Sequence, residues 1–573
     1  MMTQRITIPR LRLMGEQGSL KILRARRLLA VAIASSVGLS GLITVAAPAS
    51  ASTRSTGTAV QEYIDVNVTM KDNVFTPQRV TVDPGATIHW PNEGYNDHNI
   101  IPNKKKAAWG DKIIGVGEEY EYKFAKPGVY EYFCSFHGAP GRGMFGSITV
   151  KNADGTLPKD VKQDGDGRSG SLASSAKSKT IRVPADAKTI QGGVDKANPG
   201  DMVLVSPGVY HEAVLVTTDR IVIRGLDRNK TILDGRYELE NGIKIIGANG
   251  VVVENMTARR YERNGFFWTG VKGYRGSYLT STRTGDYGIY AFDSVEGILD
   301  HDYGSGSPDA GFYIGQCFPC HSIIRDSISE YNGLGYSGTN ASGNLVIANS
   351  IWRFNRAGIV PNSGSGEALA PQRKATVIGN LVYSNNNGET PSIGAAKLAQ
   401  GNGILIAGGN DNLVTKNRVW DHDIAGIVSV LNPEKTVFFA NRNRVIKNIV
   451  SDSGEGDLAT FGGEGNCFSH NVFKTSKPSN IEQVHPCPTG VGVPATDVLD
   501  LQKYIDASKP PSVDYKIAKT PKPPALAGMK NPKGAKAVPA VGIKAEVKKW
   551  KKANLKSIRM PKAITNLKTT KTP

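Results

Sequence analysis

The stretch YFCSFHGAPGRGMFGSITV, residues 132–150, places a cysteine, a histidine and a methionine close together. Two residues separate Cys134 from His137, and six separate His137 from Met144. A further histidine, His98, follows an earlier strand-like run in HWPNEGYNDHNI. Two imidazoles, one thiolate and one weak thioether suit a trigonal copper site with a long axial bond. The sequence therefore predicts a one-electron metal site built from these four side chains.

A zinc site and a ligand role for His89 are the alternatives to this copper site. Zinc also accepts thiolate and imidazole ligands, but a thioether is a poor zinc ligand, so copper is favoured. His89 lies inside the strand-like run TIHW and is interpreted as a packed or surface residue.

Short alternating runs between Val60 and Val150, separated by turns such as DPG and KPG, predict an antiparallel β-sandwich of about ninety residues.

Residues 60–150 resemble the plastocyanin and azurin family of blue copper proteins, or cupredoxins. The resemblance lies in VFTPQRVTVDPGATIHWPNEGYNDHNI and GVYEYFCSFHGAPGRGMFGSITV. It implies that His98 and His137 are the imidazole ligands of one type 1 copper, Cys134 its thiolate ligand and Met144 its axial ligand. It also implies electron transfer with a redox partner protein. The spacing between His137 and Met144 is longer than in many members, so the axial role departs most from the family pattern.

A repeat organises the second half of the chain. Glycines open short apolar runs at intervals of 23 or 24 residues, and one interval of 45 is interpreted as two turns. A second series of polar residues after apolar pairs is interpreted as corners. The glycines are Gly242, Gly265, Gly288, Gly311, Gly335, Gly358, Gly403 and Gly426, and the corner residues are Asn255, Asp326, Asn349, Asn380, Asn417 and Asn448. This pattern predicts a parallel β-helix, with a short capping helix in KTIQGGVDKANPGD.

Residues 180–505 resemble the right-handed parallel β-helix proteins of the pectin lyase type. They are also similar to the periplasmic copper-binding β-helix protein associated with nitrous oxide reductase maturation. The resemblance lies in TIQGGVDKANPGDMVLVSPGVY and in the repeat. Because many such folds are enzymes and many are not, three roles stay open: a binding surface for a polysaccharide or partner, a polysaccharide lyase or epimerase, and a non-catalytic cell-surface scaffold.

Lyase or epimerase chemistry needs acidic and basic groups side by side, to neutralise a uronate carboxylate and to move a proton. The candidates are Asp300, His301 and Asp302, together with Asp309. The triplet DHD recurs at residues 421–423 at a different phase of the coil; corner positions are the alternative explanation of both copies, and the first copy is the favoured catalytic candidate.

The five cysteines leave at least one unpaired if the others form bridges. Cys134 is the expected free thiol, and Cys317 with Cys320 and Cys467 with Cys487 are expected disulfides. The run CFPCH also matches the c-type haem attachment pattern, but the repeat continues directly through it, which favours a disulfide.

The chain begins with features typical of an export signal. Basic RARR at residues 24–27 precedes an apolar run, and Ala49-Ser50-Ala51 forms a small-x-small cleavage site. A signal peptide is therefore predicted over residues 1–51; the alternative is a retained membrane anchor. We expect a secreted or cell-envelope protein with no transmembrane segment after cleavage.

Two polar segments flank the predicted β-helix. Residues 151–179 are predicted to be a linker. The tail, residues 506–573, holds 17 Lys or Arg from Lys509 onward against two acidic residues, which accounts for most of the net charge of +19. Because the tail is rich in Lys, Pro and Ala and poor in large apolar residues, it is predicted to be largely disordered. Acidic polysaccharides or anionic envelope polymers are the expected partners of the tail, and nucleic acid is not an expected partner.

Taken together, the predicted β-sandwich and the predicted β-helix give the chain an all-β fold class.

Overall fold

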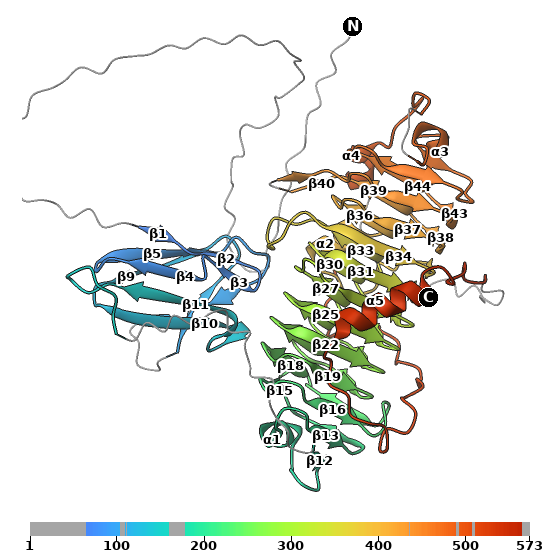
Figure 1. Cartoon of the computed structure of the whole chain (residues 1–573). Helices are drawn as coiled ribbons and strands as arrows, with labels where there is room; N and C mark the ends of the chain where they lie inside the picture. Colours follow the sequence, from blue (N-terminus) through green and yellow to red (C-terminus); the bar gives the residue numbers. More distant parts are fainter. Residues whose placement is uncertain are drawn as a thin grey trace, which may run out of the picture. The chain divides into compact units, whose positions relative to one another are not determined.

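The computed structural model describes residues 65–103, 109–110, 112–159, 178–434, 436–488, 492–506 and 510–563. Residues 62–573 form one compact unit. A small β-sandwich is followed by a parallel β-helix, as predicted (Figure 1). The predicted signal peptide lies outside the described residues, as do residues 160–177 of the predicted linker. In the described ranges no helix is long and apolar enough to cross a membrane.

The sandwich consists of two small sheets, ordered β1-β5-β9 and β4-β11-β10-β7, and the pairs β2-β3 and β6-β8. Burial alternates along β5, and the inward side chains, such as Trp90, pack with Tyr132 and Phe124 in one apolar core. The strands are β1 (Val66–Asn67), β2 (Thr69–Lys71), β3 (Val74–Thr76), β4 (Arg79–Val82), β5 (Ala86–Pro91), β6 (His98–Asn99), β7 (Ile101–Pro102), β8 (Ile113–Ile114), β9 (Glu119–Phe124), β10 (Gly128–Ala139) and β11 (Arg142–Val150).

The described part of the β-helix contains three long parallel sheets, and successive coils add one strand to each. The first sheet consists of β12 (Thr180–Val183), β13 (Met202–Val205), β16 (Val222–Gly225), β19 (Val251–Glu254), β22 (Lys272–Ser277), β25 (Val295–Asp300), β28 (Ser322–Arg325), β31 (Ser342–Ala348), β34 (Arg373–Ile378), β37 (Leu413–Thr415), β42 (Arg444–Ile446) and β45 (Cys467–Ser469).

The second sheet consists of β14 (Gly208–Tyr210), β17 (Thr231–Asp234), β20 (Thr257–Arg259), β23 (Thr280–Thr282), β26 (Tyr303–Ser305), β29 (Ile328–Glu330), β32 (Ile351–Arg353), β35 (Leu381–Tyr383), β38 (Arg418–His422) and β43 (Ile449–Ser453). The third consists of β15 (Val214–Val216), β18 (Ile243–Ile246), β21 (Phe266–Thr269), β24 (Tyr287–Phe292), β27 (Ala310–Gly315), β30 (Leu334–Thr339), β33 (Ala357–Asn362), β36 (Asn402–Ala407), β39 (Ala425–Val430), β44 (Gly456–Phe461) and β46 (Ser476–Lys477). The pair β40 (Asn432–Pro433) and β41 (Val437–Phe438) forms a separate hairpin, and α3 (Ile481–Val484) and α4 (Leu501–Asp506) follow the last coils.

The glycine repeat marks the third sheet. Gly265 immediately precedes β21, and Gly288 is the second residue of β24. The interpretation of the 45-residue interval as two turns is wrong, because β33 pairs directly with β36, with Ile359 opposite Ile404. One coil is enlarged by two insertions, residues 363–372 and 384–401, and the second of these contains α2 (Gly394–Leu398).

The predicted corner series occupies two different positions of the coil. Asn255 and Asn349 adopt left-handed backbone conformations, with φ of 60° and 50°. Asn380, Asn417 and Asn448 lie one residue further along and are buried. Nδ2 of Asn380 donates a hydrogen bond to Oδ1 of Asn417 at 3.0 Å. Nδ2 of Asn417 donates in the same way to Oδ1 of Asn448, also at 3.0 Å. The stacked amides thus satisfy one another's hydrogen-bonding groups between successive coils, without water.

The predicted capping helix and the predicted pairing of the cysteines agree with the structure. Helix α1 (Ile190–Asp195) covers the first coil, and its cap Thr189 accepts the N–H of Gly192 at 3.0 Å. Cys317–Cys320 and Cys467–Cys487 are disulfides, while Cys134 is free and buried.

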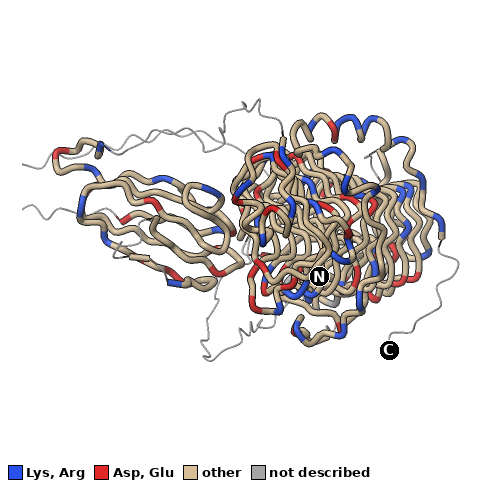
Figure 2. Tube along the Cα trace, turned by 90° about the horizontal axis from the view of Figure 1, so that it is seen from below, with Lys and Arg blue, Asp and Glu red and all other residues tan. Residues whose placement is uncertain are grey.

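The prediction of a disordered tail is wrong for residues 510–563. Helix α5 (Ile543–Asn554) lies against the first sheet, and Ile543 and Val547 are buried there with Val252 and Ile298 (Figure 1). Figure 2 shows that Lys and Arg predominate along this helix. Composition does not predict this order, because it counts only the tail's own apolar residues, whereas the surface that buries them belongs to the β-helix.

Arginines of the β-helix hold the tail backbone. Arg224 donates to the carbonyls of Pro532 and Ala535 at 3.1 and 2.6 Å. Arg356 donates to the carbonyls of Pro510 and Pro511 at 3.1 and 2.8 Å. A segment without regular hydrogen bonding leaves its carbonyls unpaired, so these guanidinium groups supply the donors that its own backbone does not.

The variant Val547→Asp is expected to release the tail. Burying a valine contributes about 2 kcal/mol, and a carboxylate in its place would be buried without a partner. Cleavage of the tail by trypsin, followed by gel electrophoresis, should become at least about tenfold faster. Ala545→Asp introduces the same charge on the exposed side of α5 and should leave the rate unchanged. Equal rates for both variants would contradict the packing of this helix.

Candidate metal centre

The hairpin of β10 and β11 builds most of the site. Phe133 pairs with Phe145 and Gly138 with Gly143, so the four residues Cys134 to His137 stand opposite Met144 alone. This bulge gives Cys134 and His137 a common direction that regular alternation would not. Gly143 has φ of 61°, and a Cβ there would lie 2.7 Å from the carbonyl oxygen of His137. Only glycine therefore allows the hairpin to close so tightly.

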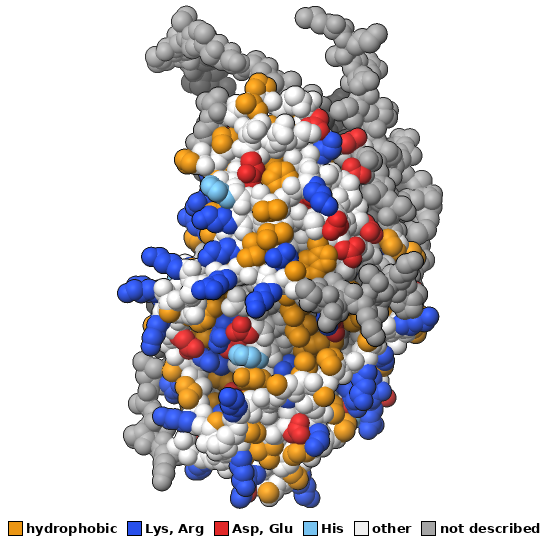
Figure 3. Space-filling model, turned by 90° about the vertical axis from the view of Figure 1, so that its right-hand side faces the viewer, with side chains coloured by type: hydrophobic (Ala, Val, Ile, Leu, Met, Phe, Trp, Pro, Cys, Tyr) orange, Lys and Arg blue, Asp and Glu red, His pale blue; other side chains and the backbone are white. Residues whose placement is uncertain are grey.

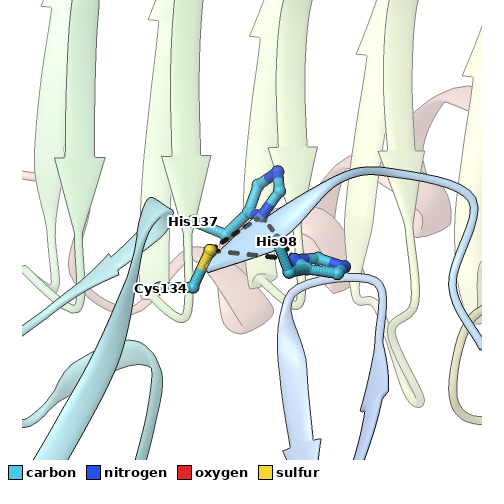
Figure 4. A group of neighbouring side chains, drawn as sticks. All are labelled: His98, Cys134 and His137. Carbon is cyan, nitrogen blue, oxygen red and sulfur yellow. Dashed lines mark hydrogen bonds between the residues drawn. The ribbon is translucent and has the colours of Figure 1, made fainter. Parts of the chain in front are cut away.

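The structure brings His98, Cys134 and His137 together (Figure 4). Sγ of Cys134 lies 3.7 Å from Nδ1 of each histidine, and the two Nδ1 atoms are 3.1 Å apart. A point equidistant from these three atoms is about 2 Å from each, which matches the bonds of about 2.0 to 2.3 Å that first-row metals form with imidazole and thiolate. The three side chains therefore fit a copper ion.

Burial and charge shift the pKa values of all three side chains. Burial favours the neutral form of His98, but Asp72 and the Cys134 sulfur outweigh it and raise the pKa of His98 to about 9. Burial likewise favours the thiol of Cys134, but the neighbouring His98 lowers the pKa of Cys134 overall. Burial, with the positive charges of His98 and Arg263, holds the pKa of His137 well below its ordinary value. The shifts at Cys134 and His137 favour the deprotonated forms that bind a metal, whereas the raised pKa of His98 means that a metal binding there displaces a proton.

Residues that the sequence did not single out complete the surroundings. The Asn99 side chain donates to Oγ of Ser135 at 2.9 Å and accepts its backbone N–H at 2.8 Å, which joins the His98 strand to the Cys134 strand. Lys244 of β18 donates to the Ser135 carbonyl at 3.0 Å. The guanidinium of Arg263 lies 4.9 Å from the centre of the Phe136 ring. Spacing along the chain carried no signal for these contacts between distant residues.

Two further predictions concern Met144 and His89. Met144 is 1% exposed and shares an apolar core with Cys134, and its place opposite the bulge is compatible with an axial role, which stays a prediction. His89 lies on β5, where its Nδ1 is 2.6 Å from Oε1 of Glu119. It takes no part in the group formed by His98, Cys134 and His137.

The candidate catalytic residues of the β-helix each have partners of their own. Asp300 ends β25 and pairs with Arg325 and with the hydroxyl of Ser277. His301 occupies a left-handed corner with φ of 57°, and its ring stacks on Tyr278 at 4.6 Å. Oδ1 of Asp302 accepts the backbone N–H of Leu279 at 2.7 Å. These are contacts between neighbouring coils of the kind that corner residues make.

Asp309 immediately precedes β27, and β26 lies between it and Asp302 in the chain. It accepts a hydrogen bond from the hydroxyl of Tyr287 at 2.7 Å. Its burial, and to a smaller extent the nearby charge of Asp286, raise the pKa of Asp309. The partners described for Asp309 thus differ from those of Asp300 to Asp302, and a shared catalytic role for the four residues stays a prediction. In the second DHD copy, His422 is buried against the amide of Asn385 at 3.2 Å, as expected for a corner residue.

Two family models match the chain. Copper-binding proteins of the plastocyanin/azurin family match residues 63–151, and the right-handed β-helix region matches residues 264–437. Among solved structures, the A-module of the mannuronan C-5 epimerase AlgE4 from Azotobacter vinelandii has a TM-score of 0.39 and 13% identity, covering 49% of this chain and 90% of its own. A purple cupredoxin from Nitrosopumilus maritimus has a TM-score of 0.12 and 28% identity, covering 14% and 82%.

Curated relatives match the same N-terminal part. Plastocyanin of Scenedesmus fuscus is 37% identical over 87 residues, which cover 14% of this chain and 87% of that protein. Chloroplastic plastocyanin of Tetradesmus obliquus is 33% identical over 87 residues, and the chain spans 59% of its length. Through the domain that carries His98, Cys134 and His137, the chain therefore belongs to the plastocyanin/azurin family of copper-binding proteins.

Proposed function

We propose that this protein is an exported one-electron carrier that binds a single type 1 copper ion through His98, Cys134 and His137, with Met144 as a weak axial ligand. The observation that supports it best is the buried triangle of two Nδ1 atoms and one Sγ atom. Copper supplies a one-electron couple between Cu(I) and Cu(II) when bound. We place the protein outside the cytoplasm, in keeping with the export signal expected at its N-terminus.

The protein's own residues restrict what happens at this site. His98 and Cys134 are fully buried and His137 is 6% exposed, so bulk water is kept from the donor atoms. The Asn99–Ser135 contacts and the β10–β11 hairpin hold the donors at fixed separations. A site that changes little between two oxidation states has a small reorganisation cost, which favours fast electron transfer over bond-making chemistry.

Cys134→Ser is expected to abolish the intense visible absorption of the Cu(II)-loaded protein, because that band arises from charge transfer between thiolate and copper. The measurement is an absorption spectrum after adding one equivalent of Cu(II), with metal content determined in parallel. His89→Gln is the matched control, since His89 lies outside the site, and it should keep the band. A Cys134→Ser protein that stays coloured would overturn the assignment of the site.

Met144→Leu tests the axial ligand. The two side chains are of similar volume, so the free energy of unfolding should change by less than about 1.5 kcal/mol. Loss of a sulfur donor disfavours Cu(II) more than Cu(I), so voltammetry should show a higher reduction potential with copper still bound. Met256→Leu makes the same exchange at a buried β-helix position and should leave the potential unchanged. If both variants keep the original potential, Met144 is a core residue and no ligand.

We also propose that the β-helix and its tail bind an anionic polymer, such as an acidic polysaccharide of the cell envelope. The supporting observation is a surface depression of about 530 Å³ lined by Lys416, Lys447, Lys556 and Arg559, with no acidic residue among its lining. The space-filling view in Figure 3 shows Lys and Arg side chains over the left and lower parts of this face, whereas several Asp and Glu side chains lie toward its upper right. Converging cations without local counter-charges attract polyanions.

Replacing Lys447, Lys556 and Arg559 together with glutamine should weaken binding to immobilised polygalacturonate. Salt weakens the attraction between exposed charges, which is screened within about 8 Å at physiological ionic strength. Because the variant has three fewer positive charges in the depression, less salt should be needed to elute it than to elute the wild type. Replacing the exposed tail residues Lys519, Lys522 and Lys533 removes the same charge outside the depression. If both triple variants elute together, net charge rather than this depression determines the binding.

A further inference from the structure

A carboxylate lies beside the outer nitrogen of one proposed copper ligand. Nε2 of His98 is 3.4 Å from Oδ1 of Asp72. His98 is fully buried and Asp72 is 2% exposed, so water does not screen this pair. Among the described residues, none forms a hydrogen bond of ordinary geometry with this nitrogen. Asp72 therefore provides the charge that faces the outer edge of the His98 ring.

The position of this carboxylate is built by the backbone around it. Asp72 lies in the turn between β2 and β3, and the N–H of Tyr95 donates to its two oxygens at 2.9 and 3.0 Å. The N–H of Asn96 donates to Oδ1 at 3.0 Å. A Cβ at Gly94 would lie 2.4 Å from the same oxygen, so a side chain there would displace the carboxylate. Residues 94–96 thus form a cradle for one anionic group.

The β-helix holds the same turn from its other side. The N–H of Asp72 donates to the carbonyl of Gly366 at 3.0 Å. The next residue, Asn73, donates from Nδ2 to the hydroxyl of Tyr290 at 3.2 Å. The hydroxyl of Tyr95 donates to Glu434 at 2.6 Å. The backbone of Asp72 and its cradle are thus fixed from two directions, and the carboxylate has little freedom to turn away from His98.

We propose that Asp72 is a positioning residue that orients His98 and lowers the reduction potential of the copper ion bound there. The inference rests on the proposed copper-binding function. With Nδ1 directed to the metal, the ring proton resides on Nε2 and faces the carboxylate. A carboxylate behind a metal-bound imidazole fixes the ring orientation and strengthens its donation to the metal. Both this effect and the negative charge itself stabilise Cu(II) more than Cu(I).

The test is voltammetry of the full-length copper-loaded protein and of Asp72→Asn, which keeps the shape of the side chain and removes its charge. The potential of Asp72→Asn should be higher than that of the wild type, with the thiolate-to-copper band retained. Asp83→Asn removes a carboxylate from the same domain; Asp83 is exposed and pairs with Lys151, and its variant should stay near the wild-type potential. Asp72→Ser carries the same expectation if Asp72→Asn does not fold.

The outcomes separate two kinds of failure. A neutral Asp72 variant that binds copper at the wild-type potential overturns the role of Asp72. A variant that folds but no longer binds copper assigns Asp72 to assembly of the site and overturns its role in setting the potential. If the wild type itself binds no copper with a thiolate band, the proposed function fails, whatever the variants do.

Discussion

The candidate metal centre depends on one close approach: the two histidine Nδ1 atoms lie 3.1 Å apart with a cysteine sulfur 3.7 Å from each, and all three side chains are buried. Three side chains from two strands, β6 and β10, meet at this separation only because the surrounding fold holds them in place. Asn99 ties the strand of His98 to that of Cys134, and the bulge opposite Met144 turns Cys134 and His137 to the same side. The sandwich core beneath is rigid because stacked rings such as Trp90 and Trp109 fill it.

The β-helix solves a different problem, the satisfaction of polar groups inside a long stack. Its interior alternates apolar side chains with amides such as Asn417 and Asn448, each bonded to its counterpart one coil away. The same rule explains the tail: carbonyls of an irregular segment are matched by arginines such as Arg224 and Arg356 that project from the coils. Buried polar groups are tolerated where each one has a partner.

Contacts between the sandwich and the β-helix give the copper domain a fixed environment. The turn carrying Asp72 and Asn73 bonds to Gly366 and Tyr290. Lys244 bonds to the backbone within the Cys134–His137 bulge. The electrostatic surroundings of the candidate metal ligands are therefore set partly by residues that lie more than a hundred positions away in the chain. A cupredoxin of this kind is not electrically independent of the domain that follows it.

The sequence by itself determined the chemistry and the repeat. Cys134, His137 and Met144 lie within one hairpin, where spacing translates directly into position, and the glycine interval predicts the coil because each coil repeats the same local geometry. Only the tertiary structure decided what depends on distant partners. The long coil between Gly358 and Gly403, the ordered tail and the carboxylate of Asp72 beside His98 all arise from packing between remote segments. Spacing along a chain does not record which remote surfaces meet, because those contacts follow from the burial of apolar area and the pairing of buried polar groups in the whole fold.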